Sequence, residues 1–177
     1  MRPLLFNEAL RRKEICRMKK ELGGVSGRVY ELLLPVVNAA GCDIWDVDFV
    51  KEGSKHILRI TIDAEDGVGI DDCERVHRAV DPVLDEADPI DISYYLEVSS
   101  PGIERDITLP RHVEACVGQR AEARLYAPRD GRRVFTGVIE GLSEGGGVLL
   151  RECEGAEPAE LPLDAISKMK TLYSFGD

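Results

Sequence analysis

Residues 45–62 read WDVDFVKEGSKHILRITI, and apolar and polar side chains alternate in this stretch on both sides of a short turn. Trp45, Val47 and Phe49 occupy every second position of the first half, and the second half alternates in the same way. A period of two places such residues on one face of a β-strand. Gly53 lies in the polar segment between the halves. The stretch therefore predicts an antiparallel hairpin with one buried face.

Two helical patterns flank this hairpin. Apolar residues recur at three- and four-residue steps over residues 26–40, and a second stripe of this kind follows the hairpin. Asp71 and Glu74 have the spacing of a capping box at the start of the second stripe. Because proline lacks a backbone N–H, we expect a bend or break at Pro35 and a kink or split at Pro82.

A third alternating segment covers residues 94–98. The order of elements is then helix, strand, strand, helix, strand, over residues 25–110. With so few strands, both helices are expected to cover one face of the sheet, and the second helix connects the second and third strands. This part of the chain is predicted to be a two-layer α/β domain.

The sequence changes character after Pro110. A short turn is expected over residues 111–117, and five strand-sized runs separated by turn residues follow it. Short strands at such spacing are typical of a small barrel of the SH3 or Sm type. Gly137 and Gly141 lie inside one run and would permit tight bends. We predict an all-β domain over residues 111–177, and an α+β fold class with two domains for the chain.

Charge is distributed unevenly along the sequence. Residues 1–28 carry a net +5, residues 29–110 a net −13 and residues 111–177 a net −2, which gives the formal net charge of −10. The basic N-terminal extension, residues 1–24, is interpreted either as a solvated helical segment or as an arm that contacts rRNA. The acidic middle segment repels phosphate and attracts basic proteins, so a cationic protein is the favoured partner there.

Composition excludes other classes of protein. No run approaches the roughly 18 apolar residues that a membrane-spanning helix needs. The five cysteines lie 26 or more residues apart, without the close pairs that are typical of zinc sites. We therefore expect a cytoplasmic protein with reduced thiols, no metal and no cofactor. Nothing in the sequence demands more than a monomer.

The segment Ser99-Ser100-Pro101-Gly102 has two interpretations. Proline followed by glycine suits the two central positions of a type II turn. A serine nucleophile needs a base within hydrogen-bond reach, and no neighbouring residue is an evident base. The sequence favours the turn, and an enzyme that uses Ser99 or Ser100 is the weaker hypothesis.

Three arginines, Arg129, Arg132 and Arg133, gather at a predicted hairpin tip of the second domain. Exposed arginines at such a tip either contact RNA phosphate or keep the turn soluble. Aromatic side chains for base stacking are scarce in the sequence. An RNA-binding module that acts through the barrel is therefore the alternative to a protein-binding function.

Residues 95–105 read YLEVSSPGIER. This stretch resembles the hallmark of the RimP-type ribosome maturation factors, where it ends the N-terminal domain. Residues 83–90 and 161–168 also resemble recurrent positions of that family, and the resemblance extends over about residues 27–175. His77 and Asp106 depart from it, since serine and proline are common at these two positions.

The resemblance implies a bacterial, cytoplasmic, non-enzymatic factor that acts late in assembly of the small (30S) ribosomal subunit. It implies an N-terminal α/β domain joined to an Sm-like barrel. The implied partners are the free subunit and a very basic small-subunit ribosomal protein beside the decoding centre, with an rRNA contact as a further possibility. Arg105 and the four residues before Ile103 are expected to fix the angle between the domains or to make a contact.

Overall fold

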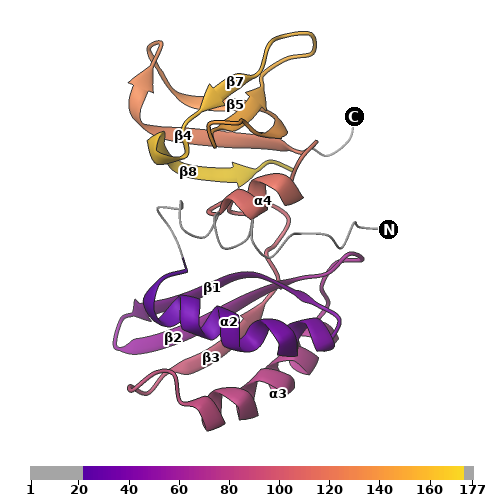
Figure 1. Cartoon of the computed structure of the whole chain (residues 1–177), viewed down its shortest axis with the longest axis vertical. Coiled ribbons are helices and arrows are strands. Elements are labelled where there is room, and N and C mark those ends of the chain that lie inside the picture. The colour runs from indigo at the N-terminus through magenta and orange to yellow at the C-terminus, as the bar shows by residue number, and fades with distance from the viewer. Residues whose placement is uncertain (1–21, 174–177) are drawn as a thin grey trace. The chain divides into compact units, whose positions relative to one another are not determined.

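The computed structural model of the chain describes residues 22–173 (Figure 1). The described residues divide into two compact units, of which the first ends at Pro101 and the second begins at Gly102. Each unit has its own sheet. The domain limits expected after residues 24 and 110 stay predictions, and most of the basic extension lies outside the described residues.

The first unit has the predicted order of helix, strand, strand, helix, strand. Its elements are α2 (Gly24–Ala39), β1 (Asp43–Glu52), β2 (Lys55–Asp63), α3 (Ile70–Ala87) and β3 (Tyr95–Ser99). β1 and β2 form the predicted antiparallel hairpin, and Gly53 in its turn has a φ of +61°. β3 pairs with β2 in parallel, so α3 is the crossover between them. A mixed α/β class is confirmed for this unit.

Both helices cover the same face of the sheet β1-β2-β3 (Figure 1). Their apolar stripes meet that face in one core, which contains Leu33 of α2, Val80 of α3 and Ile60 of β2. All three of these side chains are fully buried. The alternation that predicted the hairpin therefore arises because one sheet face packs against helices.

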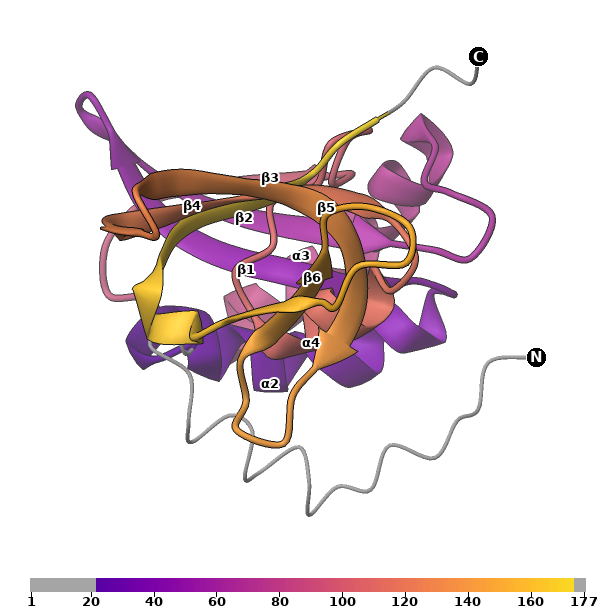
Figure 2. The same ribbon diagram turned by 90° about the horizontal axis from the view of Figure 1, so that it is seen from above.

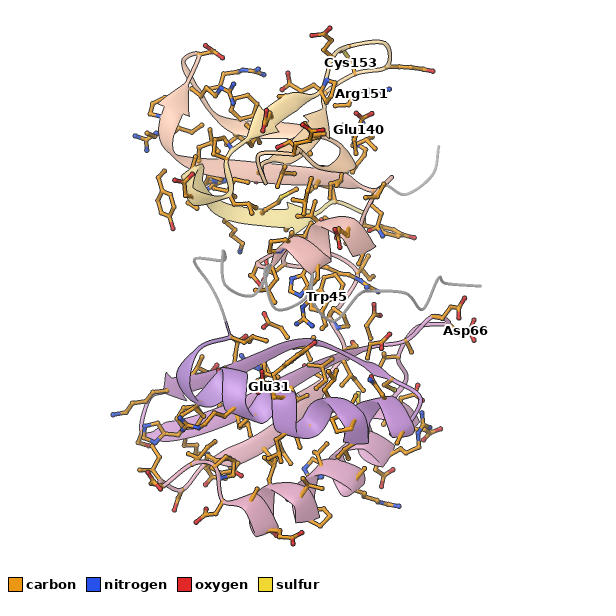
Figure 3. All side chains as sticks on the ribbon, in the orientation of Figure 1. Glu31, Trp45, Asp66, Glu140, Arg151 and Cys153 are labelled. Atoms are coloured by element: carbon orange, nitrogen blue, oxygen red, sulfur yellow. The ribbon has the colours of Figure 1, made fainter. Side chains whose placement is uncertain are left out.

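The alternation in β1 is interrupted at Trp45. The register between β1 and β2 shifts between Ile44 and Asp46, so Trp45 is an extra residue in a β-bulge. Ile44 and Val47 belong to the core under the helices, whereas Trp45, which is labelled in Figure 3, is buried outside that core. The prediction that Trp45 shares a face with Val47 is wrong, because the bulge moves the alternation by one residue.

Both helices continue through their prolines. Pro35 lies inside α2 and Pro82 lies inside α3, so the predicted break and the predicted split are wrong. Buried residues lie on both sides of each proline, as Leu33 and Val37 do around Pro35. Burial of these side chains offsets the backbone hydrogen bond that each proline removes.

The start of α3 differs from the sequence-based expectation. The N-cap residue is Gly69, and its N–H donates to Oδ2 of Asp72 at 2.9 Å. The predicted capping box of Asp71 and Glu74 is therefore wrong. The carboxylate three residues after the N-cap comes from Asp72, while Glu74 pairs with Arg78 on the next turn.

The second unit is rich in β-structure. A short helix lies where a turn was expected. Nδ1 of His112 accepts hydrogen bonds from the N–H groups of Thr108 and Leu109 at 3.2 and 3.3 Å, and these bonds cap the start of the helix. The elements are α4 (Pro110–Ala115), β4 (Arg120–Arg129), β5 (Arg132–Leu142), β6 (Val148–Arg151), β7 (Ala159–Leu161), the 3₁₀ turn η1 (Leu163–Ala165) and β8 (Ile166–Thr171).

The five strands of this unit form one antiparallel sheet in the order β7-β6-β5-β4-β8. The sheet is strongly curved (Figure 2). Within residues 22–173 the strand pairings join neighbours in this order, and none joins β7 to β8. A β-rich C-terminal part is confirmed, whereas closure into an Sm-like or SH3-like barrel stays a prediction.

Glycine permits a close approach between β5 and β6. A Cβ atom at Gly137 would lie 2.4 Å from the carbonyl oxygen of Arg151. Gly141 adopts a φ of +136° beside the register shift between Ile139 and Gly141. Glu140 and Arg151 form an ion pair across these strands (Figure 3). Gly141 thus lies at an irregularity of β5, whereas Gly137 permits the close approach of β6, and a tight bend at Gly137 stays a prediction.

Candidate protein-binding site

A hollow lies in the first unit between the C-terminal half of α3 and the segment that leads into β3. Four carboxylates line it, from Asp81, Asp85, Asp88 and Asp91. Lys and Arg are absent from its lining residues. We call this feature the acidic hollow, and a cation that enters it meets negative charge without a competing lining cation.

Asp81 and Asp85 on α3 and Asp88 at its C-cap are electrostatically unfavourable for the helix itself. Asp81, Asp85 and Asp88 follow one another at steps of four and three residues, which places them on one side of the helix. Like charges at this spacing repel. The last turn carries no basic residue, and negative charge there opposes the helix dipole. A bound cationic group would relieve both effects.

A tyrosine reports the negative potential of the acidic hollow. Burial raises the pKa of Tyr94, and the carboxylates of Asp85, Asp81 and Asp88 raise it further. These carboxylates therefore act on the phenol together, because each disfavours the negative charge of a phenolate. Asp81, Asp85 and Asp88 therefore contribute to one negative potential at the Tyr94 phenol.

Apolar side chains accompany the carboxylates. Tyr95 is 60% exposed and Ile92 is 46% exposed, and both line the acidic hollow. Exposed apolar groups beside charge are typical of protein-binding surfaces. The surface is therefore suited to a segment that carries both cationic and apolar side chains.

The predicted junction residues lie where the two compact units divide. Ser99 ends β3, Ser100 is exposed, and Pro101 and Gly102 are the residues between which the units separate. Gly102 has a φ of +81°, the conformation that a type II turn requires after proline. The chain bends at Ile103 and Glu104 rather than at Pro101 and Gly102, so the predicted type II turn stays a prediction. A role of the junction residues in setting an inter-domain angle stays a prediction.

Arg105 is held by its main chain to the last strand of the second unit. Its N–H donates to the hydroxyl of Thr171 at 2.8 Å, and the N–H of Thr171 donates to the Arg105 carbonyl at 2.9 Å. One residue earlier, Glu104 pairs with Lys170 at 2.8 Å. The end of the YLEVSSPGIER stretch is thus part of the second unit.

The three arginines of the hairpin tip differ in their surroundings. Arg129 donates to the carbonyl oxygen of Glu160. Arg132 pairs with Glu152 at 2.8 Å, and its guanidinium lies 4.6 Å from the centre of the Phe135 ring. Arg133 is exposed. Two of the three arginines therefore make contacts within the unit, and their contact with RNA stays a prediction.

The hypothesis of a serine enzyme gains no support from the surroundings of Ser99 and Ser100. Within residues 22–173, neither hydroxyl is hydrogen-bonded to a His, Asp or Glu side chain. The same residues contain no group of three His, Cys, Asp or Glu side chains arranged to hold a metal ion. None of the helices in the described part of the chain is long and apolar enough to cross a membrane.

Sequence reasoning identified the acidic segment but not the acidic hollow. The signal was available in the spacing of Asp81, Asp85 and Asp88, which places three carboxylates on one side of a helix. The contributions of Asp91, Tyr94 and the neighbouring apolar residues depend on the path of the segment after α3. That path is fixed by tertiary packing and has no local sequence signal.

The chain thus combines an α/β unit that carries the acidic hollow with a β-rich unit that follows it in the sequence. Residues 32–104 match the family model described as RimP N-terminal domain. The chain therefore carries a RimP N-terminal domain, and this match supports its assignment to the RimP-type ribosome maturation factors. The resemblance carried by residues 95–105 is confirmed for this part of the chain.

Proposed function

We propose that this chain is a cytoplasmic, non-enzymatic maturation factor of the small (30S) ribosomal subunit. Its N-terminal domain binds a basic small-subunit ribosomal protein near the decoding centre, and it acts without a cofactor. The observation that carries this proposal is the acidic hollow, in which Asp81, Asp85, Asp88 and Asp91 meet without a lining cation. The surrounding segment, residues 29–110, has a net charge of −13.

The proposed mechanism is that of a chaperone. A free basic ribosomal protein binds RNA through its positive charge, and this electrostatic binding is not specific for any RNA sequence. Carboxylates that cover part of this charge delay unspecific contacts until the protein reaches its rRNA site. Electrostatic attraction between the partners gives a fast encounter that weakens as salt increases.

The second unit supplies an additional contact in this proposal. A curved β-sheet of the Sm or SH3 type presents loops and strand edges to a protein or to RNA. Arg133 is exposed at the hairpin tip next to Val134, which is 39% exposed. If the chain is instead an RNA-binding module, replacement of Arg129, Arg132 and Arg133 should abolish subunit binding and reduce the salt slope of affinity.

Sedimentation of the tagged full chain in a sucrose gradient of cell lysate tests the proposal. We expect it to migrate with free small subunits and to be absent from complete ribosomes. A variant with Asp81→Asn, Asp85→Asn and Asp88→Asn should shift toward the top of the gradient. The matched control, Asp71→Asn with Glu74→Gln and Glu86→Gln, removes as many charges from α3 outside the hollow lining and should sediment as the parent does.

A parent protein that stays at the top of the gradient at low salt would contradict the proposal. Equal sedimentation of the hollow variant and the parent would show that the acidic hollow does not carry the interaction.

A further inference from the structure

The strand β3 is an edge of its sheet. The sheet has the order β1-β2-β3, and within residues 22–173 β3 pairs with β2 alone. An edge strand presents unpaired N–H and C=O groups on its outer side, and these groups can bind another extended chain. β3 is therefore a candidate for strand addition.

The helix-facing side chains of β3 are covered incompletely. Leu96 and Val98 pack against the core but remain half-buried, whereas their pairing partners Leu58 and Ile60 on β2 are 0% exposed. The core side chains of β2 are thus fully covered, whereas those of β3 are partly exposed. A further strand beside β3 would complete the cover of Leu96 and Val98.

The acidic hollow opens at the first residues of this edge. Tyr94, Tyr95 and Leu96 line it from the strand side, and Asp81 and Asp85 line it from α3. The unpaired backbone groups of β3 and the carboxylates of α3 therefore border the same surface. In a chain that pairs with β3, the side chains on the helix-covered face of the sheet would point toward these carboxylates.

The edge is held firmly to the rest of the sheet. Nε of Arg59 on β2 donates to Oε1 of Glu97 on β3 at 2.8 Å, and Nη2 of the same guanidinium lies 3.1 Å from Oε1 of Glu52 on β1. Glu97 and Glu52 raise the pKa of Arg59 above its ordinary value. This bridge spans all three strands on the face opposite the helices, so β3 is preorganised to accept a partner.

We propose that an extended, Lys/Arg-containing segment of the basic partner binds as a fourth strand on the free edge of β3. Main-chain hydrogen bonds to β3 hold the segment, and the carboxylates of Asp81, Asp85 and Asp88 bind its basic side chains. The inference rests on the proposed function in that the partner is a basic protein. It adds the conformation of the bound segment and the strand that receives it.

Strand addition imposes a pattern on the partner. Successive side chains of the added strand point to opposite sheet faces. Those on the helix side are expected to be Lys or Arg, whose aliphatic stems cover Leu96 and Val98 while their charged ends meet the carboxylates. Those on the other side adjoin Tyr95 and are expected to be β-branched or aromatic. The recognised segment should therefore alternate basic and apolar residues.

Backbone-methylated peptides test this inference on the full chain. The probe is a fluorescein-labelled eight-residue peptide that alternates Lys and Val, and its binding is measured by anisotropy at low salt. Two further peptides carry N-methyl groups on the odd or on the even residues, so their charge is unchanged. Alternate N–H groups of a strand point to opposite edges, so one methylated peptide loses the hydrogen bonds to β3 and the other keeps them. The first should bind at least tenfold more weakly, which corresponds to about 1.4 kcal/mol, and the second should bind as the parent does.

Hydrogen exchange provides the second readout, with the basic small-subunit ribosomal protein as the ligand. We expect slower exchange of the amides of residues 95–99 and unchanged exchange of residues 43–52, which form the other edge strand and serve as an internal control.

Equal affinity of all three peptides, failure of the unmethylated probe to bind, or no protection of residues 95–99 in the complex would each overturn the inference. Pairing of β3 with a second copy of the chain, detected as self-association in sedimentation, would also overturn it. The proposed function fails separately, since it requires only that the ribosomal protein bind and that the hollow variant weaken this binding.

Discussion

Arg105 and Thr171 hold each other by two hydrogen bonds. The N–H of Arg105 donates to Oγ1 of Thr171 at 2.8 Å, and the N–H of Thr171 donates to the carbonyl of Arg105 at 2.9 Å. Thr171 is 2% exposed, so its hydroxyl is protected from water. The last residue of the YLEVSSPGIER stretch is therefore anchored to the end of β8, and this part of the stretch has a structural task that its sequence does not reveal.

Replacement of Thr171 by Val should destabilise the second unit by about 1–3 kcal/mol, because the partly buried N–H of Arg105 loses its acceptor. Urea unfolding measures this loss, and hydrogen exchange of the Arg105 amide should accelerate. The control, Thr171→Ser, retains the hydroxyl and should leave that amide protected. Equal protection in the Val and Ser variants would show that the hydroxyl does not hold Arg105.

Replacement of Gly137 by Ala should destabilise the second unit by about 3 kcal/mol, because the new Cβ would lie 2.4 Å from the carbonyl oxygen of Arg151. Gly67→Ala is the comparison, since its Cβ meets open space while the φ of +86° is unfavourable for alanine. That variant should lose only about 1 kcal/mol. Urea unfolding measures the loss of stability in both variants, and the Gly137→Ala variant should lose more. Equal losses would contradict the close approach of β5 and β6.

The pKa of Tyr94 lies above its ordinary value because of burial and the carboxylates of Asp85, Asp81 and Asp88. Asp85→Asn should lower this pKa, whereas Glu86→Gln, on the next residue but outside the hollow lining, should change it less. Ultraviolet titration of the tyrosines, with Tyr94→Phe to assign the signal, measures the shift.

The sign of this shift also predicts the pH dependence of stability. The folded state binds the phenolic proton more tightly than the unfolded state does, so the contribution of Tyr94 is complete below the unfolded pKa of about 10 and is lost as pH rises through the folded pKa. Unfolding measurements at alkaline pH should show a smaller loss in the Tyr94→Phe variant. An equal or larger loss would contradict the assignment.

Much of the first unit was predictable because its elements carry local patterns. Alternation around Gly53 predicted the hairpin, and the stripes of apolar residues predicted two helices on one sheet face. The errors have tertiary causes. The bulge at Trp45 and the continuity of the helix through Pro82 depend on packing against the core, and neither has a signal within its own stretch of sequence.

The candidate site was predictable only in its charge. The net charge of residues 29–110 indicated a basic partner, and the spacing of Asp81 and Asp85 placed carboxylates on one helix face. The acidic hollow forms only because the segment after α3 brings Asp91 and Tyr94 back beside the helix. The free edge of β3 likewise follows from the strand order of the sheet, which no single segment encodes.

Affinity for a purified basic small-subunit ribosomal protein tests the central claim most directly. The measurement compares the parent chain, the hollow variant with Asp81→Asn, Asp85→Asn and Asp88→Asn, and the control with Asp71→Asn, Glu74→Gln and Glu86→Gln. At about 0.05 M salt we expect binding by the parent and the control, and about tenfold weaker binding by the hollow variant, since each exposed charge contributes about 0.5 kcal/mol. The difference should shrink as salt increases. Equal affinity of the hollow variant and the control would contradict the account.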